Sequence, residues 1–303
     1  MSRIMGKNLT RNILITGSMG FVGSHLSKEL TCEGYNCTDF DIINNNDILN
    51  LDDLLSIDKP VDVVIHLAAK ISAGKSFQNP GNIYQFNFQS TLNVLEFCRL
   101  NEVYKIIFVS SFVYGQPEYL PVDENHPVAI KNPYGRSKVF GELLCQSYAQ
   151  DYGINAKVIR PFNLYGPGQN EDFLIPTIIK QALWGDKINV QSLNPKRDFI
   201  FVYDFIKIFP LLIEMSDWEE QNFEVYNVGS GKSYSVQEIV DLVNKLLKQN
   251  KVANSLNNDR KNEILDCIAD ISKISKKLNW KPAYSLEEGL RITINSFLEK
   301  QNV

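Results

Sequence analysis

The chain has 303 residues, of which 44% are hydrophobic, and a formal net charge of -4 at pH 7. A chain of this length and composition can form one large domain or two closely packed domains with a full core. The acidic balance and the lack of a basic run argue against nucleic acid or an anionic membrane surface as a partner.

Residues 1–11 lack the apolar stretch of a signal peptide, and no apolar run approaches the ~18 residues that cross a bilayer. The five cysteines form no CxxC pair and are accompanied by only 3 histidines. This pattern is typical of reduced thiols and argues against a disulfide framework or a metal site. We therefore expect a cytoplasmic protein with no metal and no membrane-spanning segment.

The first half of the chain alternates short β-rich runs with longer helical patterns, which is typical of βαβ units and a parallel sheet. The predicted strands cover residues 12–16, 36–41, 61–68, 105–110 and 156–161, and the predicted helices cover residues 23–33, 82–99 and 134–152. The second half is predicted to contain helices at 174–184, 203–215, 235–248, 271–278 and 286–299 and strands at 197–202 and 225–228.

These elements predict an α/β fold with a Rossmann-like doubly wound parallel sheet in residues 1–165. A smaller C-terminal α/β substrate-binding domain is expected in residues 166–303, with segments near residues 200–225 packing back on the first domain. No linker rich in Pro, Gly or Ser separates the two parts, which indicates a packed boundary.

Three glycines, Gly17, Gly20 and Gly23, connect the first predicted strand to the first predicted helix. Gly17 permits a turn with positive φ, Gly20 lets the backbone approach a pyrophosphate, and Gly23 lets the helix pack closely on the strand. Asp41, at the end of the second strand and about 20 residues beyond the turn, can bind a ribose diol. No arginine follows it in residues 42–44 to accommodate a 2'-phosphate, so the sequence favours NAD over NADP.

A phenol and an ammonium group share one face of a predicted helix, because Tyr134 and Lys138 are one helical turn apart. A phenol titrates near pH ~10 in water, so an adjacent cation is needed to make it a base at neutral pH. Ser110, at the end of the fourth predicted strand, can hold a substrate oxygen by a hydrogen bond. Together with the glycine turn, these residues indicate nicotinamide chemistry at an alcohol or ketone.

The motifs together resemble the extended short-chain dehydrogenase/reductase family, which comprises the NAD-dependent sugar epimerases and dehydratases. The resemblance covers essentially the whole chain, in the order of the family. It rests on residues 16–23 (TGSMGFVG), 47–48 (DI), 66–69 (HLAA), 110–115 (SSFVYG), 134–138 (YGRSK), 160–168 (RPFNLYGPG), 197–202 (RDFIFV), 226–231 (YNVGSG), 269–273 (ADISK) and 280–282 (WKP).

The resemblance implies a role for each matching residue. The catalytic residues would be Ser110, Tyr134 and Lys138. NAD would be bound by Gly17, Gly20, Phe21, Val22, Gly23, Asp41, Asp47, Ile48, Leu67, Ala68, Ala69, Tyr134 and Lys138. A nucleotide-diphosphate sugar would be bound by Ser110, Ser111, Phe112, Asn163, Arg197 and Arg260.

Two of these assignments have structural alternatives, and His66 is expected to be structural. Arg197 precedes Asp198 and could be the partner of an internal ion pair, whereas Arg260 lies in a polar segment that could simply be solvated. His66 is expected to be a strand-end histidine whose polar atoms are satisfied by the backbone.

One departure from the family narrows the reaction. Dehydratases of the family have a sequence similar to Thr-Asp-Glu at the positions where this chain has Ser110, Ser111 and Phe112. A phenylalanine cannot protonate a leaving hydroxyl. Dehydration is therefore not expected. The resemblance implies an NDP-sugar 4-epimerase, with an NDP-4-keto-6-deoxysugar reductase as the alternative and a non-catalytic nucleotide-binding protein as a distant one. The nucleotide and the sugar stay open.

The helical stretches at residues 83–100 and 139–148 carry apolar residues on more than one face. Relatives commonly pair these helices across a two-fold axis, so a homodimer is expected. The alternative is that both helices are buried within a single subunit.

Overall fold

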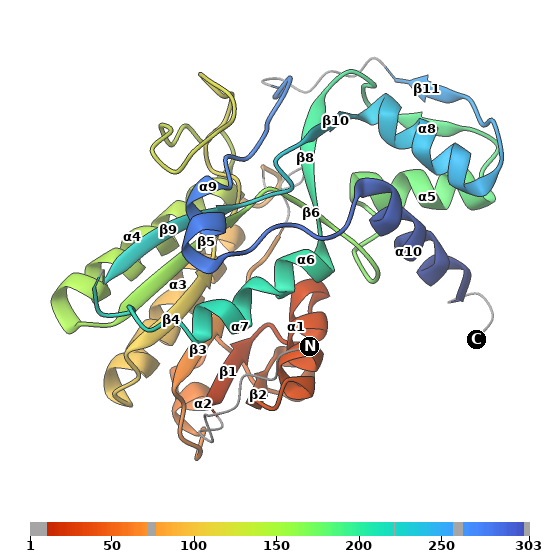
Figure 1. Ribbon diagram of the computed structural model, residues 1–303. Coiled ribbons are helices and arrows are strands. Elements are labelled where there is room, and N and C mark those ends of the chain that lie inside the picture. Colours follow the sequence, from red (N-terminus) through yellow and green to blue (C-terminus); the bar gives the residue numbers. More distant parts are fainter. Residues whose placement is uncertain (1–10, 72–76, 221, 257–262, 300–303) are drawn as a thin grey trace.

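The computed structural model describes residues 11–71, 77–220, 222–256 and 263–299. A large lobe is built around a central sheet, and a smaller lobe projects from one end of it (Figure 1). Across the described residues, no helix combines the length and the apolar character that crossing a bilayer requires.

The central sheet has six parallel strands in the order β2-β1-β3-β4-β5-β9. The strands are β1 (Asn12–Thr16), β2 (Asn36–Phe40), β3 (Val63–His66), β4 (Lys105–Val109), β5 (Asn155–Pro161) and β9 (Phe223–Val228). The chain runs outward from β1 to β2 and then returns across β1 to β3. In folds of this kind, ligands bind at such a reversal of strand order, at the carboxyl ends of the strands.

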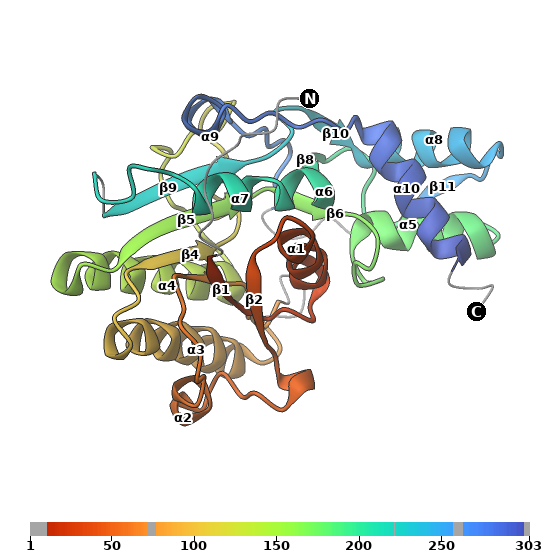
Figure 2. The ribbon, with the colours of Figure 1, turned by 60° about the horizontal axis from the view of Figure 1, so that its bottom comes forward.

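Helices cover both faces of this sheet (Figure 2). One face carries α2 (Leu51–Leu55), α3 (Pro80–Leu100) and α4 (Pro133–Tyr152). The other face carries α1 (Phe21–Cys32), α6 (Val202–Ile206), α7 (Ile208–Ile213) and α9 (Ser272–Leu278). The expectation of a doubly wound parallel sheet is confirmed.

The smaller lobe is also α/β (Figure 1). Its sheets are β10-β8-β6 and β11-β7, formed by β6 (Asn163–Tyr165), β7 (Ile188–Val190), β8 (Lys196–Phe201), β10 (Ser233–Ser235) and β11 (Ala253–Ser255). Its helices are α5 (Leu174–Trp184), α8 (Val236–Leu247) and α10 (Leu286–Glu299). Ser235 and Glu238 begin α8 with a reciprocal capping box.

Strand β9 belongs to the central sheet although it follows residue 166 by more than fifty positions. The chain therefore enters the smaller lobe, returns to complete the sheet beside β5, and then enters the smaller lobe again. The division into residues 1–165 and 166–303 stays a prediction.

Some elements differ from the sequence prediction. The strand predicted at 61–68 is only four residues long, and the helix predicted at 203–215 is two helices that meet at Lys207. Pro210 explains this break, because a proline ring clashes with the carbonyl four residues earlier, at Ile206. Strands β6, β7, β10 and β11 have three residues each, which is too short for a periodic pattern to reveal.

Candidate active site

The glycine turn lies where β1, β2 and β3 end. Gly17 has φ +73°, and a Cβ atom there would lie 2.8 Å from Ala68 Cα. A Cβ on Gly23 would lie 2.1 Å from the Gly17 carbonyl oxygen, so α1 can only pack this closely on the turn with glycine at that position. The predicted reasons for both glycines are therefore visible in the geometry.

The turn also leaves polar groups available to a ligand. Gly20 is the N-cap of α1 and provides no side-chain cap, so the first amides of the helix have no side-chain partner there. Ser18 Oγ is, among the described residues, a buried side-chain oxygen without a hydrogen-bond partner. Free amides and a hydroxyl beside a glycine cradle fit the pyrophosphate of NAD.

Asp41 stands beside the turn, as predicted. Its carboxylate accepts hydrogen bonds from the Met19 amide at 3.0 Å and from the Ile43 amide at 3.1 Å. Asp41 comes directly after β2, the neighbour of β1, and this places an acceptor for a ribose diol next to the glycines.

The other predicted cofactor residues surround the same edge of the sheet. Phe21 and Val22 are half-buried on the first turn of α1, and Leu67, Ala68 and Ala69 follow β3. The Leu67 amide donates to the Thr16 carbonyl oxygen at 3.1 Å, which joins the loop after β3 to the end of β1.

Asp47 and Ile48 lie beyond the end of β2. Asp47 Oδ1 accepts from the Leu49 amide at 2.9 Å, and the buried Ile48 offers its carbonyl oxygen to Asn93 Nδ2 at 2.9 Å. Hydrogen bonds thus order this pair, but its contact with NAD stays a prediction.

Tyr134 and Lys138 lie on the first two turns of α4. Asn132 caps this helix by accepting from the Gly135 amide at 2.8 Å, and Pro133 occupies the first helical position. Tyr134 is half-buried, whereas Lys138 is buried with its Nζ 4.4 Å from the centroid of the Phe108 ring.

Burial dominates the titration of both groups. It raises the pKa of Tyr134 to about 12, against a hydrogen bond from Ser111 that lowers it. It lowers the pKa of Lys138 to about 8, against the thiol of Cys145 and the carboxylate of Glu142, which raise it. The expected lowering of the Tyr134 pKa by Lys138 is not seen, because burial raises this pKa and only the Ser111 hydrogen bond opposes it.

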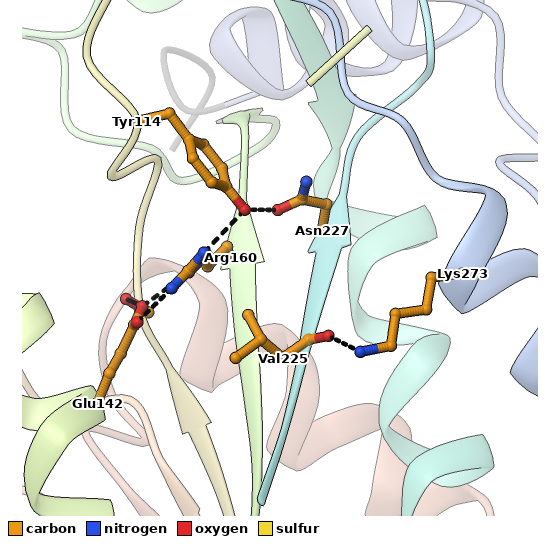
Figure 3. A network of polar contacts seen from close by, with 7 residues as sticks. Tyr114, Glu142, Arg160, Val225, Asn227 and Lys273 are labelled. Carbon is orange, nitrogen blue, oxygen red and sulfur yellow. Dashed lines mark hydrogen bonds and ion pairs between the residues drawn. The ribbon is translucent and has the colours of Figure 1, made fainter. Parts of the chain in front are cut away.

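Ser110 is buried directly after β4, and its hydroxyl donates to Glu142 Oε1 at 2.5 Å. Glu142 is paired with Arg160 on β5, which also donates to the hydroxyl of Tyr114 (Figure 3). Ser110 therefore lies at the predicted position, and its side chain is held by a buried ion pair.

The sequence interpretation assigned no role to Glu142, Arg160 or Asn87. Glu142 follows Lys138 by one helical turn, and Arg160 interrupts the apolar run of β5, so a charge at each position was the available signal. Asn87 on α3 accepts from the Lys70 amide at 2.8 Å and donates to Ser137 Oγ at 2.8 Å. It joins the loop after β3 to α4.

His66 is structural, but its partners differ from those expected. Nδ1 lies 2.7 Å from Thr16 Oγ1 and Nε2 lies 3.2 Å from Thr91 Oγ1, so two hydroxyls replace the predicted backbone groups. Burial, assisted by the positive charge of Lys138, lowers the pKa of His66 to about 3.

Ser111 and Phe112 are half-buried and follow Ser110 at the carboxyl edge of the sheet. The Phe112 ring packs edge-on against Tyr114 and Phe162, with centroids 5.5 and 5.1 Å apart. Asn163 begins β6 and donates from Nδ2 to the Asp198 carbonyl oxygen at 3.1 Å. The packed ring of Phe112 thus lies at the position where the family resemblance places an acidic residue in dehydratases.

Arg197 is in an ion pair, as the structural alternative expected, although its partner is not the adjacent Asp198. It pairs instead with Glu263 and donates from Nη1 to the Ile264 carbonyl oxygen at 2.6 Å. Asp198 is buried and accepts from Ser230 and from the amides of Gly231 and Ala269. Arg197 therefore meets the segment that follows residue 262, and Arg260 lies outside the described residues.

Comparison with known proteins agrees with this geometry. The sequence profile of the NAD dependent epimerase/dehydratase family matches residues 13–229. A Methanocaldococcus jannaschii protein provisionally named UDP-glucose 4-epimerase is 34% identical over 93% of this chain and 97% of its own. GDP-6-deoxy-D-mannose reductase of Pseudomonas aeruginosa is 28% identical over 95% of this chain and 98% of its own.

A solved structure shows the same likeness in three dimensions. UDP-glucose 4-epimerase of Thermotoga maritima, in complex with UDP-glucose, matches with a TM-score of 0.87 and 28% identity over 96% of this chain and 99% of that one. The family profile spans the glycine turn, Ser110, Tyr134 and Lys138. The chain belongs to the NAD-dependent epimerase/dehydratase family, and NAD is its cofactor.

Proposed function

We propose that this protein is an NAD-dependent 4-epimerase of nucleotide-diphosphate sugars. The observation that supports this most directly is the placement of Tyr134 and Lys138 on the first turns of α4, at the same sheet edge as Ser110 and the glycine turn. The relatives named as UDP-glucose 4-epimerases support the substrate class.

The proposed chemistry begins with orientation of the substrate. Ser110 holds the oxygen at C4, and Tyr134 accepts the proton of that hydroxyl as the alcohol becomes a ketone. When bound, NAD supplies the hydride acceptor for C4 and afterwards the hydride donor. The sugar must present its other face to the cofactor between these two events, and Tyr134 then returns the proton.

Burial raises the pKa of Tyr134 to about 12, which disfavours its phenolate, and the Ser111 hydrogen bond opposes this shift. The positive charge of an oxidised nicotinamide beside the phenol would favour the phenolate. Proton removal is thereby linked to the presence of NAD, which limits unproductive chemistry.

The diphosphate is proposed to lie between the two lobes, held by Asn163, Arg197 and Arg260. Guanidinium is suited to this role because its planar fork meets two phosphate oxygens at once. Arg197 lies at the start of β8, and its pairing with Glu263 would have to be shared with or exchanged for the diphosphate.

Two other activities remain to be tested against this proposal. The Pseudomonas aeruginosa reductase among the relatives favours reduction of an NDP-4-keto-6-deoxysugar as the second candidate. A non-catalytic nucleotide-binding role is less favoured, because Ser110, Tyr134 and Lys138 are all present. Dehydration is not proposed, because Phe112 offers no acid.

An isotopic experiment tests the choice between epimerase and reductase. Purified protein is incubated, without added cofactor, with a UDP- or dTDP-hexose that carries deuterium at C4. An epimerase interconverts the two C4 epimers and keeps most of the label at C4. If the common NDP-hexoses are unchanged and an NDP-4-keto-6-deoxyhexose is reduced with loss of NADH or NADPH, the epimerase proposal is wrong and the protein is a reductase.

We also propose that the protein acts in the cytoplasm as a homodimer. Its cysteines are all free, which suits a reducing compartment. Several large apolar side chains on α3 and α4 are exposed, and they suit a second copy of the chain as the partner. These side chains are Phe88, Leu100, Phe140 and Leu143.

A further inference from the structure

Arg197, at the start of β8, is held by three partners. Its Nη1 donates to the carbonyl oxygens of Lys196 at 2.7 Å and of Ile264 at 2.6 Å, and its Nη2 donates to the carboxylate of Glu263. The side chains of Arg197 and Glu263 are only 17% and 21% exposed. The charges of this ion pair are therefore screened less by water than those of a pair on the open surface.

The backbone on both sides of this ion pair is held by other contacts. The Lys196 amide donates to the Leu265 carbonyl oxygen at 2.8 Å, and the Ala269 amide donates to the buried carboxylate of Asp198 at 3.0 Å. These bonds join β8 to the segment that carries Glu263. The guanidinium can therefore be released by a movement of the Glu263 side chain alone.

A guanidinium can bind a phosphate through two parallel N–H groups, either Nη1 with Nη2 or Nε with Nη2. In Arg197 both carbonyl contacts are made by Nη1, so the pair that leaves them intact is Nε with Nη2. Nη2 is the atom to which Glu263 is bound. A phosphate oxygen placed there would lie beside a carboxylate, and two anions at one nitrogen repel each other.

We propose that Glu263 is a counter-ion of the substrate site, which the diphosphate of the sugar nucleotide displaces from Arg197. The inference rests on the proposed function, which assigns Arg197 to the diphosphate. In the empty protein, Glu263 compensates the charge of a guanidinium that is largely removed from water. When the product leaves, the carboxylate returns to Arg197, so the exchange weakens the binding of the nucleotide and favours its release.

An orienting role and a displaced counter-ion predict opposite effects when the charge of Glu263 is removed. If Glu263 oriented Arg197 for its ligand, loss of the carboxylate would weaken the binding of a diphosphate. The carbonyl oxygens of Lys196 and Ile264 already orient the guanidinium. We therefore expect Glu263→Gln to bind a diphosphate more tightly, because the amide keeps the size of the side chain and removes the repulsion.

The test is titration calorimetry of the NAD-loaded protein with UDP, dTDP, GDP, CDP and inorganic pyrophosphate. Saturation with NAD keeps pyrophosphate out of the cofactor site. Glu263→Gln is expected to lower the Kd of pyrophosphate, and of the nucleotide that the wild-type protein binds, by on the order of 10-fold. Arg197→Gln should raise the same Kd. Glu118→Gln removes an equal charge at an exposed position in the loop after β4 and should leave the Kd unchanged.

Two results would overturn the inference. One is a Glu263→Gln protein whose Kd equals or exceeds that of the wild type. The other is an equal decrease of Kd in Glu118→Gln, which would indicate a general effect of net charge. If Glu263→Gln does not fold, Glu263→Ala also removes the carboxylate, and the same decrease of Kd is required of it. A wild-type protein that binds neither nucleotide nor pyrophosphate, or an unchanged Kd in Arg197→Gln, would instead reject the diphosphate site of the proposed function, and the inference with it.

Discussion

The carboxylate of Asp41 accepts a hydrogen bond from the amide of Met19 at 3.0 Å, across the gap between the ends of β2 and β1. A hydrogen bond thus holds an acidic group directly beside the glycine turn. A ribose diol placed over the turn would meet this acceptor, whereas a 2'-phosphate would meet a negative charge.

The first prediction concerns cofactor choice. NAD should bind at least about tenfold more tightly than NADP, a difference of about 1.4 kcal/mol or more. Asp41→Asn should narrow this ratio, because it removes the repulsion of a 2'-phosphate. Titration with each cofactor measures this ratio of affinities. Asp39→Asn, at an exposed position on β2 two residues before Asp41, is the matched control. Equal affinities in the wild-type protein would show that Asp41 does not face the ribose.

The second prediction concerns the base. Tyr134→Phe removes the ionisable oxygen but keeps the ring, so turnover should fall by a factor on the order of 10² or more. Tyr152→Phe, an exposed position on the same helix, should leave turnover unchanged. Steady-state rates at saturating substrate give the turnover of both variants and of the wild type. Near-wild-type turnover in Tyr134→Phe would remove the phenol from the mechanism.

The third prediction is a pH dependence of stability that arises from His66. Burial lowers its pKa in the folded chain to about 3 from 6.5, so in that interval the unfolded chain binds a proton that the folded chain excludes. The stabilisation is fully present above the unfolded pKa and is lost as the pH falls toward the folded one. The slope is about 1.4 kcal/mol per pH unit for one proton.

His66→Gln removes this titration. The free energy of unfolding of the wild-type protein and of His66→Gln is measured in urea at several pH values between neutrality and mild acid. The two curves should converge as the pH falls, because only the wild type loses the His66 contribution. Parallel curves would show that His66 is not protonated on unfolding.

The fourth prediction concerns assembly. Leu143→Glu places a charge on the exposed apolar face of α4 and should convert a dimer to a monomer, because a charge cannot be buried there without a partner. Sedimentation at micromolar concentration measures the state. Val252→Glu, at an exposed apolar position in the smaller lobe, is the control. A wild-type monomer at that concentration would contradict the dimer.

Features of this protein that depend on residues close together in the chain could be predicted from its sequence. The turn at Gly17, its partner Asp41 and the one-turn spacing of Tyr134 and Lys138 depend on backbone conformations and periodicities that a few neighbouring residues determine. The division of the helix expected at 203–215 into α6 and α7 also has a local cause, Pro210, which the apolar pattern of that segment does not reflect.

Only the tertiary structure decided what distant segments do together. Glu142, Arg160 and Ser110 come from a helix and from two strand ends, and no spacing in the sequence indicates that they meet. The same holds for Arg197, whose partner is Glu263 rather than the adjacent Asp198. The physical reason is that a buried charge must find a counter-charge, and packing of the sheet and its helices determines which one lies within reach.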